Sequence, residues 1–167
     1  DWKFADWASL QSITSYGEFE QNFRVDSAVQ SNFTGGLALS QLLSFLFGTP
    51  LSAVLPQTTS TDKLTQEFRL LSGESTSFEW LAGLYYTDED SLVAQQIVPL
   101  TAGTETPAPG FPLLADLYID SSYEEIAVFA NATWYLTDRF DLSFGARQSD
   151  NDQTATQFTA GALVGDS

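Results

Sequence analysis

The 167-residue chain carries 22 acidic and 6 basic residues, a formal net charge of −16, and contains neither Cys nor His. So acidic a chain is a poor electrostatic match for nucleic-acid phosphates, and it has no basic patch to offset its charge. The lack of Cys and His excludes disulfide scaffolds, Cys/His zinc sites and Ser–His–Asp triads.

Other bulk features point to exported β-structure. Aromatic residues make up 14 % of the chain, an enrichment typical of β-sheets and of barrels with aromatic girdles. The chain has no Met, not even at its start, which indicates a processed product or a piece of a longer protein. The stretch most like a membrane helix, residues 37–55, is interrupted at Gly48 and Pro50. Its uninterrupted part is well short of the roughly 20 residues that a spanning helix needs. The first residues lack the basic start and apolar core of a signal peptide.

The first third of the chain predicts a long strand followed by a long loop. Residues 8–25 are rich in Thr, Ile, Tyr and Phe and are expected to form one strand. Residues 27–61 contain no charged residue. Within them, apolar residues recur with helical spacing at Leu39, Leu42, Leu43, Leu46 and Phe47. Gly48 stands at a helix C-cap position with Pro50 two residues on, so a short amphipathic helix is predicted inside this loop.

Residues 62–72 show a clear strand alternation. Read with period 2, one face is mainly apolar and the other carries charge. The first face holds Leu64, Gln66, Phe68 and Leu70, and the second holds Thr65, Glu67, Arg69 and Leu71. A soluble sandwich would turn the apolar face toward a core, whereas a membrane barrel would turn it toward lipid. This strand alone leaves both interpretations open.

The remaining elements follow the same pattern. A short turn at 73–76 leads into a second alternating segment, 76–97, and a Pro-rich connection follows at 98–116. A further strand is predicted at 117–136, and a tight turn, "TDR", leads into one more. The last strand places Phe140, Leu142, Phe144 and Ala146 on one face. Residues 150–167 are polar with only a weak strand signal.

Charge pairing sets the expected register of the first hairpin. We predict antiparallel partners whose residue numbers sum to 148, which places Phe68 opposite Trp80 and Arg69 opposite Glu79. A slip by two would oppose Glu67 to Glu79, a like-charge pair that costs energy.

The second hairpin is predicted to pair with residue numbers that sum to 276. This register sets Trp134 opposite Leu142 on the apolar face and brings Phe129 beside Arg147 on the other. It leaves a three-residue connection, Thr137–Arg139.

The connections alternate between long and short, so both short turns fall at one end of the sheet and both long loops at the other. Outer-membrane barrels show this asymmetry, whereas soluble sandwiches have no reason to sort their loops. The predicted strands are also about three times the 5 to 6 residues usual in soluble proteins. We therefore predict an all-β, antiparallel up-and-down meander of about five long strands, part of a transmembrane barrel, with one short helix in a long loop.

Several stretches resemble the barrel of TonB-dependent outer-membrane receptors. They are "LQSITSYGEFE", "TDKLTQEFRLLSG", "FEWLAGLYYTDEDS" and "YEEIAVFANATWYLTDRFDLSFGARQSD". The order, the spacing and particular residues carry the resemblance, among them Gln66-Glu67, Arg69-Leu70, Gly145 and Arg147. The loops at 27–61 and 98–116 match nothing in that pattern.

The resemblance implies a 22-stranded barrel, of which residues 1–167 would be a partial domain from the first half. No plug domain and no segment for the TonB energy-coupling protein is seen in the sequence, so these partners would belong to the parent receptor. The implied function is energy-coupled uptake of a scarce small-molecule ligand, such as a ferric siderophore, across the outer membrane of a Gram-negative bacterium. The outer-membrane lipid would be a further partner, and no enzymatic activity and no cofactor are expected.

The candidates for ligand contact are side chains expected to face the barrel lumen: Arg69, Glu79, Tyr85, Phe129 and Arg147. Arg69 and Arg147 could meet an anionic siderophore, or they could pair with carboxylates of the wall. The acidic groups Asp88-Glu89-Asp90, Glu124-Glu125 and Asp150/Asp152 are more consistent with solvated loop ends than with a cation site, so no metal ligand is assigned. Two other classes remain as alternatives, a passive porin-like barrel and a soluble β-rich structural or adhesion module.

Overall fold

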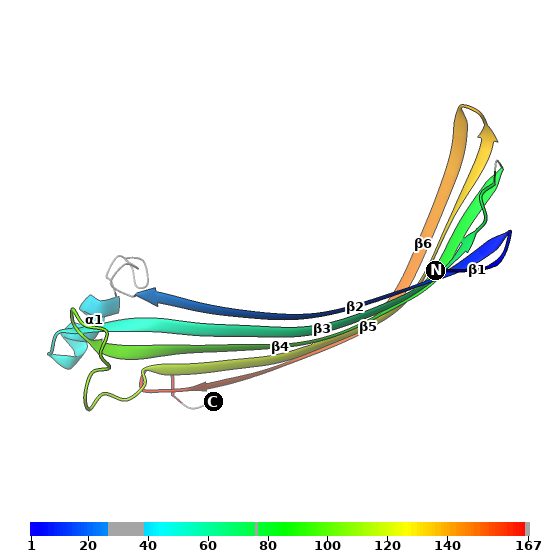
Figure 1. Ribbon diagram of the computed structural model, residues 1–167. Coiled ribbons are helices and arrows are strands. Elements are labelled where there is room, and N and C mark those ends of the chain that lie inside the picture. Colours follow the sequence, from blue (N-terminus) through cyan, green and yellow to red (C-terminus); the bar gives the residue numbers. More distant parts are fainter. Residues whose placement is uncertain (27–38, 76, 166–167) are drawn as a thin grey trace. The chain divides into compact units, whose positions relative to one another are not determined.

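Six strands and one helix make up the computed structural model, which describes residues 1–26, 39–75 and 77–165. Each strand is hydrogen-bonded to the next in sequence, so the sheet is a linear meander from β1 to β6 (Figure 1). The strands are β1 (Trp2–Ala5), β2 (Ala8–Asp26), β3 (Leu51–Ser72), β4 (Phe78–Thr101), β5 (Ala115–Thr137) and β6 (Phe140–Ala160), and α1 spans Leu39–Phe47. The predicted all-β antiparallel meander with one helix is confirmed.

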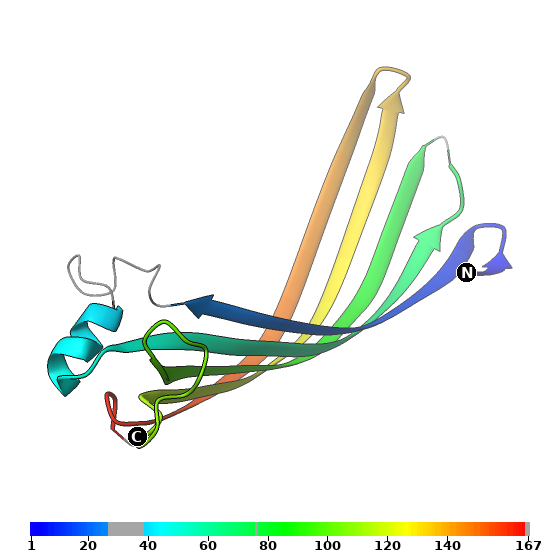
Figure 2. The same ribbon diagram turned by 60° about the vertical axis from the view of Figure 1, so that its left-hand side comes forward.

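The contacts divide the chain into two compact units, and each of the five long strands contributes to both. The first unit comprises Asp1–Glu18, Asp62–Asp90 and Ser122–Thr154, and the second comprises Phe19–Thr61, Ser91–Ser121 and Ala155–Ser167. All the short turns between strands belong to the first unit, and both long connections belong to the second, as the loop pattern predicted (Figure 2).

The second unit contains a small apolar core built around α1. Leu39 and Leu43 of the helix are buried against the start of β3 and the connection between β4 and β5. The other buried members are Leu51, Ala53, Ala108 and Leu114. Gly48 has a φ of 65°, as expected for the glycine that ends a helix. Helix α1 is not long and apolar enough to cross a membrane.

Three element boundaries differ from the predicted ones. The structure begins β3 at Leu51, so residues 51–61 are strand and not loop; residues 27–38 of that predicted loop lie outside the described residues. The second long connection shortens to 102–114. Strand β6 runs on to Ala160, through a segment in which only a weak strand signal was seen. The sequence reading also missed β1, so the sheet has six strands and not five.

The predicted register of the β3–β4 hairpin is wrong by four. Side-chain hydrogen bonds join Thr65 to Thr87 and Lys63 to Glu89, pairs whose numbers sum to 152. Thr61 and Ser91, in the second unit, give the same sum. At the turn, Gly73 N donates a hydrogen bond to Trp7 O, in the connection between β1 and β2. Because the slip is even, each side chain keeps its face and only its partner changes.

The predicted register of the β5–β6 hairpin agrees with the structure. Hydrogen bonds join Ser122 to Thr154 and Thr133 to Ser143, and both pairs sum to 276. Strand β5 ends at Thr137 and β6 begins at Phe140, so two residues connect them where three were predicted.

Contacts between strands fix which side chains share a face in the first unit. In β3 to β6, the odd-numbered residues hydrogen-bond and stack with one another across strands. Even-numbered residues of β4, β5 and β6 line a common hollow on the opposite side. We call these two surfaces the odd face and the even face.

Candidate functional site

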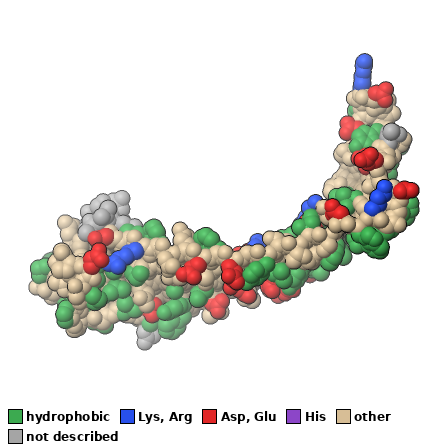
Figure 3. All heavy atoms as spheres, in the orientation of Figure 1, with side chains coloured by type: hydrophobic (Ala, Val, Ile, Leu, Met, Phe, Trp, Pro, Cys, Tyr) green, Lys and Arg blue, Asp and Glu red, His purple; other side chains and the backbone are tan. Residues whose placement is uncertain are grey.

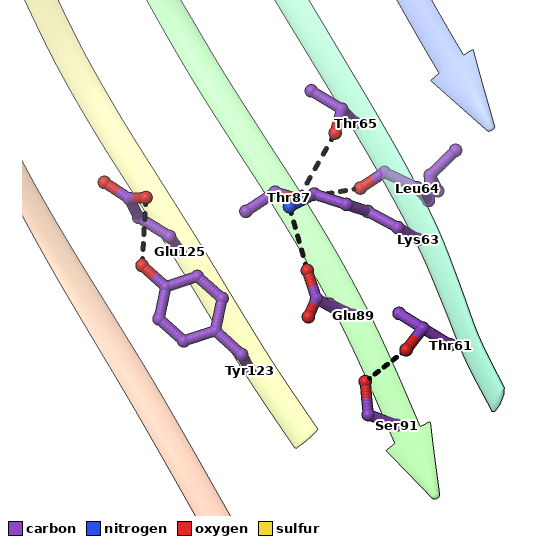
Figure 4. A network of polar contacts seen from close by, with 9 residues as sticks. All are labelled: Thr61, Lys63, Leu64, Thr65, Thr87, Glu89, Ser91, Tyr123 and Glu125. Carbon is purple, nitrogen blue, oxygen red and sulfur yellow. Dashed lines mark hydrogen bonds and ion pairs between the residues drawn. The ribbon is translucent and has the colours of Figure 1, made fainter. Parts of the chain in front are cut away.

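A three-strand cluster on the odd face is centred on Arg147 of β6. Its Nη2 lies 2.8 Å from Glu125 Oε1 on β5, and its guanidinium carbon lies 5.0 Å from the centroid of the Tyr85 ring on β4. The Tyr123 hydroxyl donates to the second oxygen of Glu125 at 3.0 Å (Figure 4). Arg147 is therefore held by an ion pair and a cation–π contact, and its side chain keeps 46 % of its surface exposed.

Phe129 lies beside this cluster and covers a glycine. A Cβ at Gly83 on the neighbouring strand would collide with the Phe129 ring, so only glycine allows the ring to lie there. Phe129 and Arg147 also line one hollow of about 380 Å³, together with Asn131, Gly145 and Ala146. The predicted proximity of Phe129 and Arg147 is thus observed.

Arg69 has a different partner from the predicted one. Its Nε and Nη2 lie 2.7 and 2.9 Å from the two carboxylate oxygens of Glu67, two residues earlier on β3. Residues i and i+2 of a strand share a face, so this bidentate pair forms within one strand. In the observed register Arg69 lies opposite Gly83, in the row of Phe129 and Arg147, and not opposite Glu79.

Glu79 lies apart from the other four candidates, toward the short turns. It accepts a hydrogen bond of 2.9 Å from the Tyr135 hydroxyl on β5. The structure therefore brings Arg69, Tyr85, Phe129 and Arg147 into one region of the odd face and leaves Glu79 outside it.

A second polar network continues the odd face toward the long connections (Figure 4). Lys63 Nζ lies 2.8 Å from Glu89 Oε2 across β3 and β4, and this hydrogen bond raises the pKa of the Lys63 ammonium. Next to it, Thr87 is almost fully buried and donates to the carbonyl of Leu64 at 3.1 Å. Among the described residues no group of three or more Asp, Glu, His or Cys side chains is placed to hold a metal ion.

The even face of the same unit is apolar. All exposed Phe, Leu, Ile, Val and Trp side chains of β3 to β6 in this unit are even-numbered. They are Leu64, Phe68, Phe78, Leu84, Ile126, Val128, Trp134, Leu136, Phe140, Leu142 and Phe144. The division of the sheet into an apolar and a charged face, inferred from one strand of the sequence, thus extends over four strands.

Comparison with known proteins agrees with this arrangement. The family described as "TonB dependent receptor-like, beta-barrel" matches residues 1–167, the whole chain. The chain belongs to this family. No match was found among curated proteins. TonB-dependent receptor barrels are transporters of the outer membrane of Gram-negative bacteria, not enzymes, and they work with a plug and with TonB.

The acidic clusters of this receptor barrel separate by face in a way that was not predicted. Glu89 and Glu125 belong to the odd face and hold Lys63 and Arg147. Their acidic sequence neighbours, Asp88, Asp90 and Glu124, are even-numbered. They share the even face with Asp62, Asp150 and Asp152, and we call these six residues the acidic belt. Acidic side chains are visible along the surface drawn in Figure 3. The clusters also lie within strands, not at loop ends, because β4, β5 and β6 extend beyond them.

Residue-by-residue alternation would have identified the polar partners that the sequence reading missed. Glu67, Tyr123, Glu125 and Tyr135 are odd-numbered, as are all five predicted site residues. The same-strand pair Glu67–Arg69 follows directly from the i, i+2 spacing. Prediction of the cross-strand partners also requires the strand register, and the register predicted from the sequence for β3 and β4 was wrong.

Proposed function

We propose that the chain forms part of the wall of a TonB-dependent receptor barrel, with the even face toward lipid and the odd face toward the lumen. The observation that carries this proposal is the division of β3 to β6 into an apolar face and a face of paired charges. Membrane barrels alternate in this way, with apolar residues outward and polar residues inward.

The height of the apolar face supports this orientation. On β5 it runs from Ile126 to Leu136, ten residues apart (136 − 126). At about 3.3 Å per residue this is about 33 Å of strand. A tilt of about 40° reduces it to a vertical height of about 25 Å, the height of the apolar band on outer-membrane barrels.

Closure of the barrel requires strands beyond these six. The described strands form an open sheet with β1 and β6 at its edges, and the smallest membrane barrels have about eight strands. We infer that residues 1–167 are a partial barrel domain, and that the further strands, the plug and the TonB-contacting segment belong to the parent receptor. The family's larger barrel, expected to have 22 strands, leaves room for a plug in its lumen.

The proposed activity is energy-coupled uptake of a scarce small molecule such as a ferric siderophore. Arg69, Tyr85, Phe129 and Arg147 supply two guanidinium groups and two aromatic rings on one part of the lumen wall, and Glu79 supplies a carboxylate nearer the short turns. Both guanidinium groups already hold carboxylates. An anionic ligand would therefore displace Glu67 from Arg69, or Glu125 from Arg147, and bind the exposed edge of that guanidinium group. Tyr85 and Phe129 would flank the bound ligand.

Uptake of a radiolabelled ferric siderophore by cells that express the complete receptor tests this proposal. Uptake should require TonB, and R147Q should lower it several-fold while the amount of folded receptor in the outer membrane stays the same. K63Q is the matched control, because Lys63 is also an ion-paired cation on the odd face but lies two rows from Tyr85, so uptake should change by less than twofold. Uptake that continues in cells without TonB would instead identify a passive, porin-like barrel.

A further inference from the structure

The even face carries a hollow of about 360 Å³ across β4, β5 and β6. It is lined by Phe78, Trp80, Leu81, Ala82, Ala130, Asn131, Ala132, Phe144, Gly145 and Ala146. The Asn131 amide does not point into it, since its Oδ1 lies where a Cβ at Gly145 would point, on the odd face. The side chains that enter the hollow are therefore apolar.

The strand register explains the shape of this hollow. Contacts between β4 and β5 join residues whose numbers sum to 212, and those between β5 and β6 sum to 276. Ala82, Ala130 and Ala146 therefore lie side by side on three strands and form a low floor. In the next row, Ala132 on β5 lies between Trp80 on β4 and Phe144 on β6, so the floor continues along β5 between the two rings. We call this hollow the alanine trench.

Aromatic rings on the two flanking strands form the sides of the alanine trench. Leu84, Val128 and Gln148, one row beyond the floor, are not part of its lining. Trp80 and Phe144 stand on the strands on either side of β5, so their Cα atoms are separated by about 10 Å. Their side chains narrow this gap further.

We propose that the alanine trench binds one acyl chain of a membrane lipid. The inference rests on the proposed function, because it requires the even face to point outward into the hydrocarbon. A helix, about 10 to 12 Å across with its side chains, is too wide for the trench. An extended peptide would bring backbone N–H and C=O groups to a floor of methyl groups, where they would stay unsatisfied in lipid.

The depth of the trench indicates which part of an acyl chain it binds. Ala132 and Ala130 lie four and six residues from Leu136 on β5, so the trench is about 10 to 15 Å from the short-turn border of the apolar face. The apolar face is about 25 Å high, so the trench lies at its middle. The bound part is therefore the end of the acyl chain, which lies at the middle of the hydrocarbon.

Filling the void is the physical reason for binding. Without an occupant, the alanine floor and the aromatic walls would lose contact with neighbouring atoms on one side. A single flexible chain can follow a channel that is only one side chain deep. Neighbouring lipids, which lie on the protruding residues of the same face, gain fewer contacts per methylene.

Photolabelling of the complete receptor in phospholipid vesicles tests the proposal. The probe is a phospholipid with a diazirine near the end of one acyl chain, and labelled peptides are identified by mass spectrometry. We expect labelling to concentrate on the segments around Ala82, Ala130 and Ala146. A130F, which fills the trench, should lower that labelling at least fivefold, whereas I126F, on the same face two rows away, should leave it within twofold.

The outcomes separate the two proposals. Labelling that is uniform over the even face and insensitive to A130F would overturn the acyl-chain site and leave the outward orientation intact. If the rest of the even face is labelled and the trench is not, the acyl-chain site is overturned and a polypeptide occupies the trench instead. Absence of label from the whole even face would overturn the proposed orientation itself. A146F fills the same trench from the neighbouring strand and replaces A130F if that variant does not fold.

Discussion

At the scale of single residues, the odd face depends on close contact between Phe129 and Gly83. The aromatic ring lies over a backbone that has no side chain, in a row that also holds Arg69 and Arg147. Glycine weakens a strand interior, so its use in β4 needs a packing reason, and the ring provides one. The contact keeps Phe129 low against the wall and leaves Arg147 accessible.

We expect G83A to destabilise the receptor by about 1 to 3 kcal/mol, because the new methyl group would overpack against the ring. The measurement is urea-induced unfolding of the complete receptor in phospholipid vesicles. G17A is the matched control, since a Cβ at Gly17 of β2 meets nothing within 4 Å. The double variant G83A/F129A should lose less stability than the sum of the two single losses. Equal stability of G83A and G17A would show that the ring does not lie over Gly83.

At the scale of elements, local signals decided what the sequence could predict. Helix α1 was predictable because Leu39, Leu43, Gly48 and Pro50 follow helical spacing and capping rules within a few residues. The start of β3 was not predictable, because polar and apolar residues do not alternate strictly over residues 51–61. This segment also contains Pro56, and proline argues against a strand. The β3–β4 register was also out of reach, since Gly73 at the β3–β4 turn bonds to Trp7, a residue more than sixty positions earlier in the chain.

The observed register of β3 and β4 predicts which engineered cysteine pairs form a disulfide. The chain contains no Cys, so the pair T65C/T87C adds the only thiols in this segment. These positions lie opposite each other, with Cα atoms expected about 4.5 to 5.5 Å apart, within the range for a disulfide. The pair should therefore oxidise readily, as seen by a gel shift that reductant reverses.

The control pair is T65C/G83C, which the predicted sum of 148 would place opposite each other. In the observed register these positions are offset by four residues, about 13 Å along the strand, which no disulfide spans. Oxidation of this pair but not of T65C/T87C would restore the predicted register.

The helix makes a matched test of packing in the second unit. Leu43 is fully buried in its apolar core, whereas Phe45, two residues away, is 84 % exposed. L43A should destabilise this core by about 2 to 5 kcal/mol, while F45A should have little effect. Limited proteolysis of the connection at 102–114 reports the loss, because that segment packs on the helix. Equal cleavage of both variants would contradict this packing.

At the scale of the whole molecule, the described sheet has two open edges and one exposed apolar face. Both edge strands, β1 and β6, lack a neighbour on one side within the described sheet. The even face exposes one continuous apolar surface that includes Phe68, Leu84, Trp134 and Phe144. Soluble monomers seldom expose more than a few hundred Å² in this way, and free strand edges invite pairing with other chains.

We therefore expect the isolated 167-residue chain to form oligomers or fibrils, or to require detergent. The charge of −16 opposes association, but salt screens it beyond about 8 Å while edge pairing acts at contact. Sedimentation in plain buffer at physiological salt is the measurement. A single species of 18.3 kDa with a cooperative unfolding transition would contradict the barrel orientation proposed above.

In the proposed orientation, the acidic belt on the even face has a consequence for how deep the wall lies in the membrane. Asp88, Glu124 and Asp152 form one row at the upper limit of the apolar face, and Trp134 and Phe140 lie near its other limit. Sliding the wall inward would drag three carboxylates into hydrocarbon, each at a cost that grows with depth. Sliding it outward would lift aromatic rings out of the interface they prefer. The acidic row and the aromatic row together would set the depth at which the barrel wall lies in the membrane.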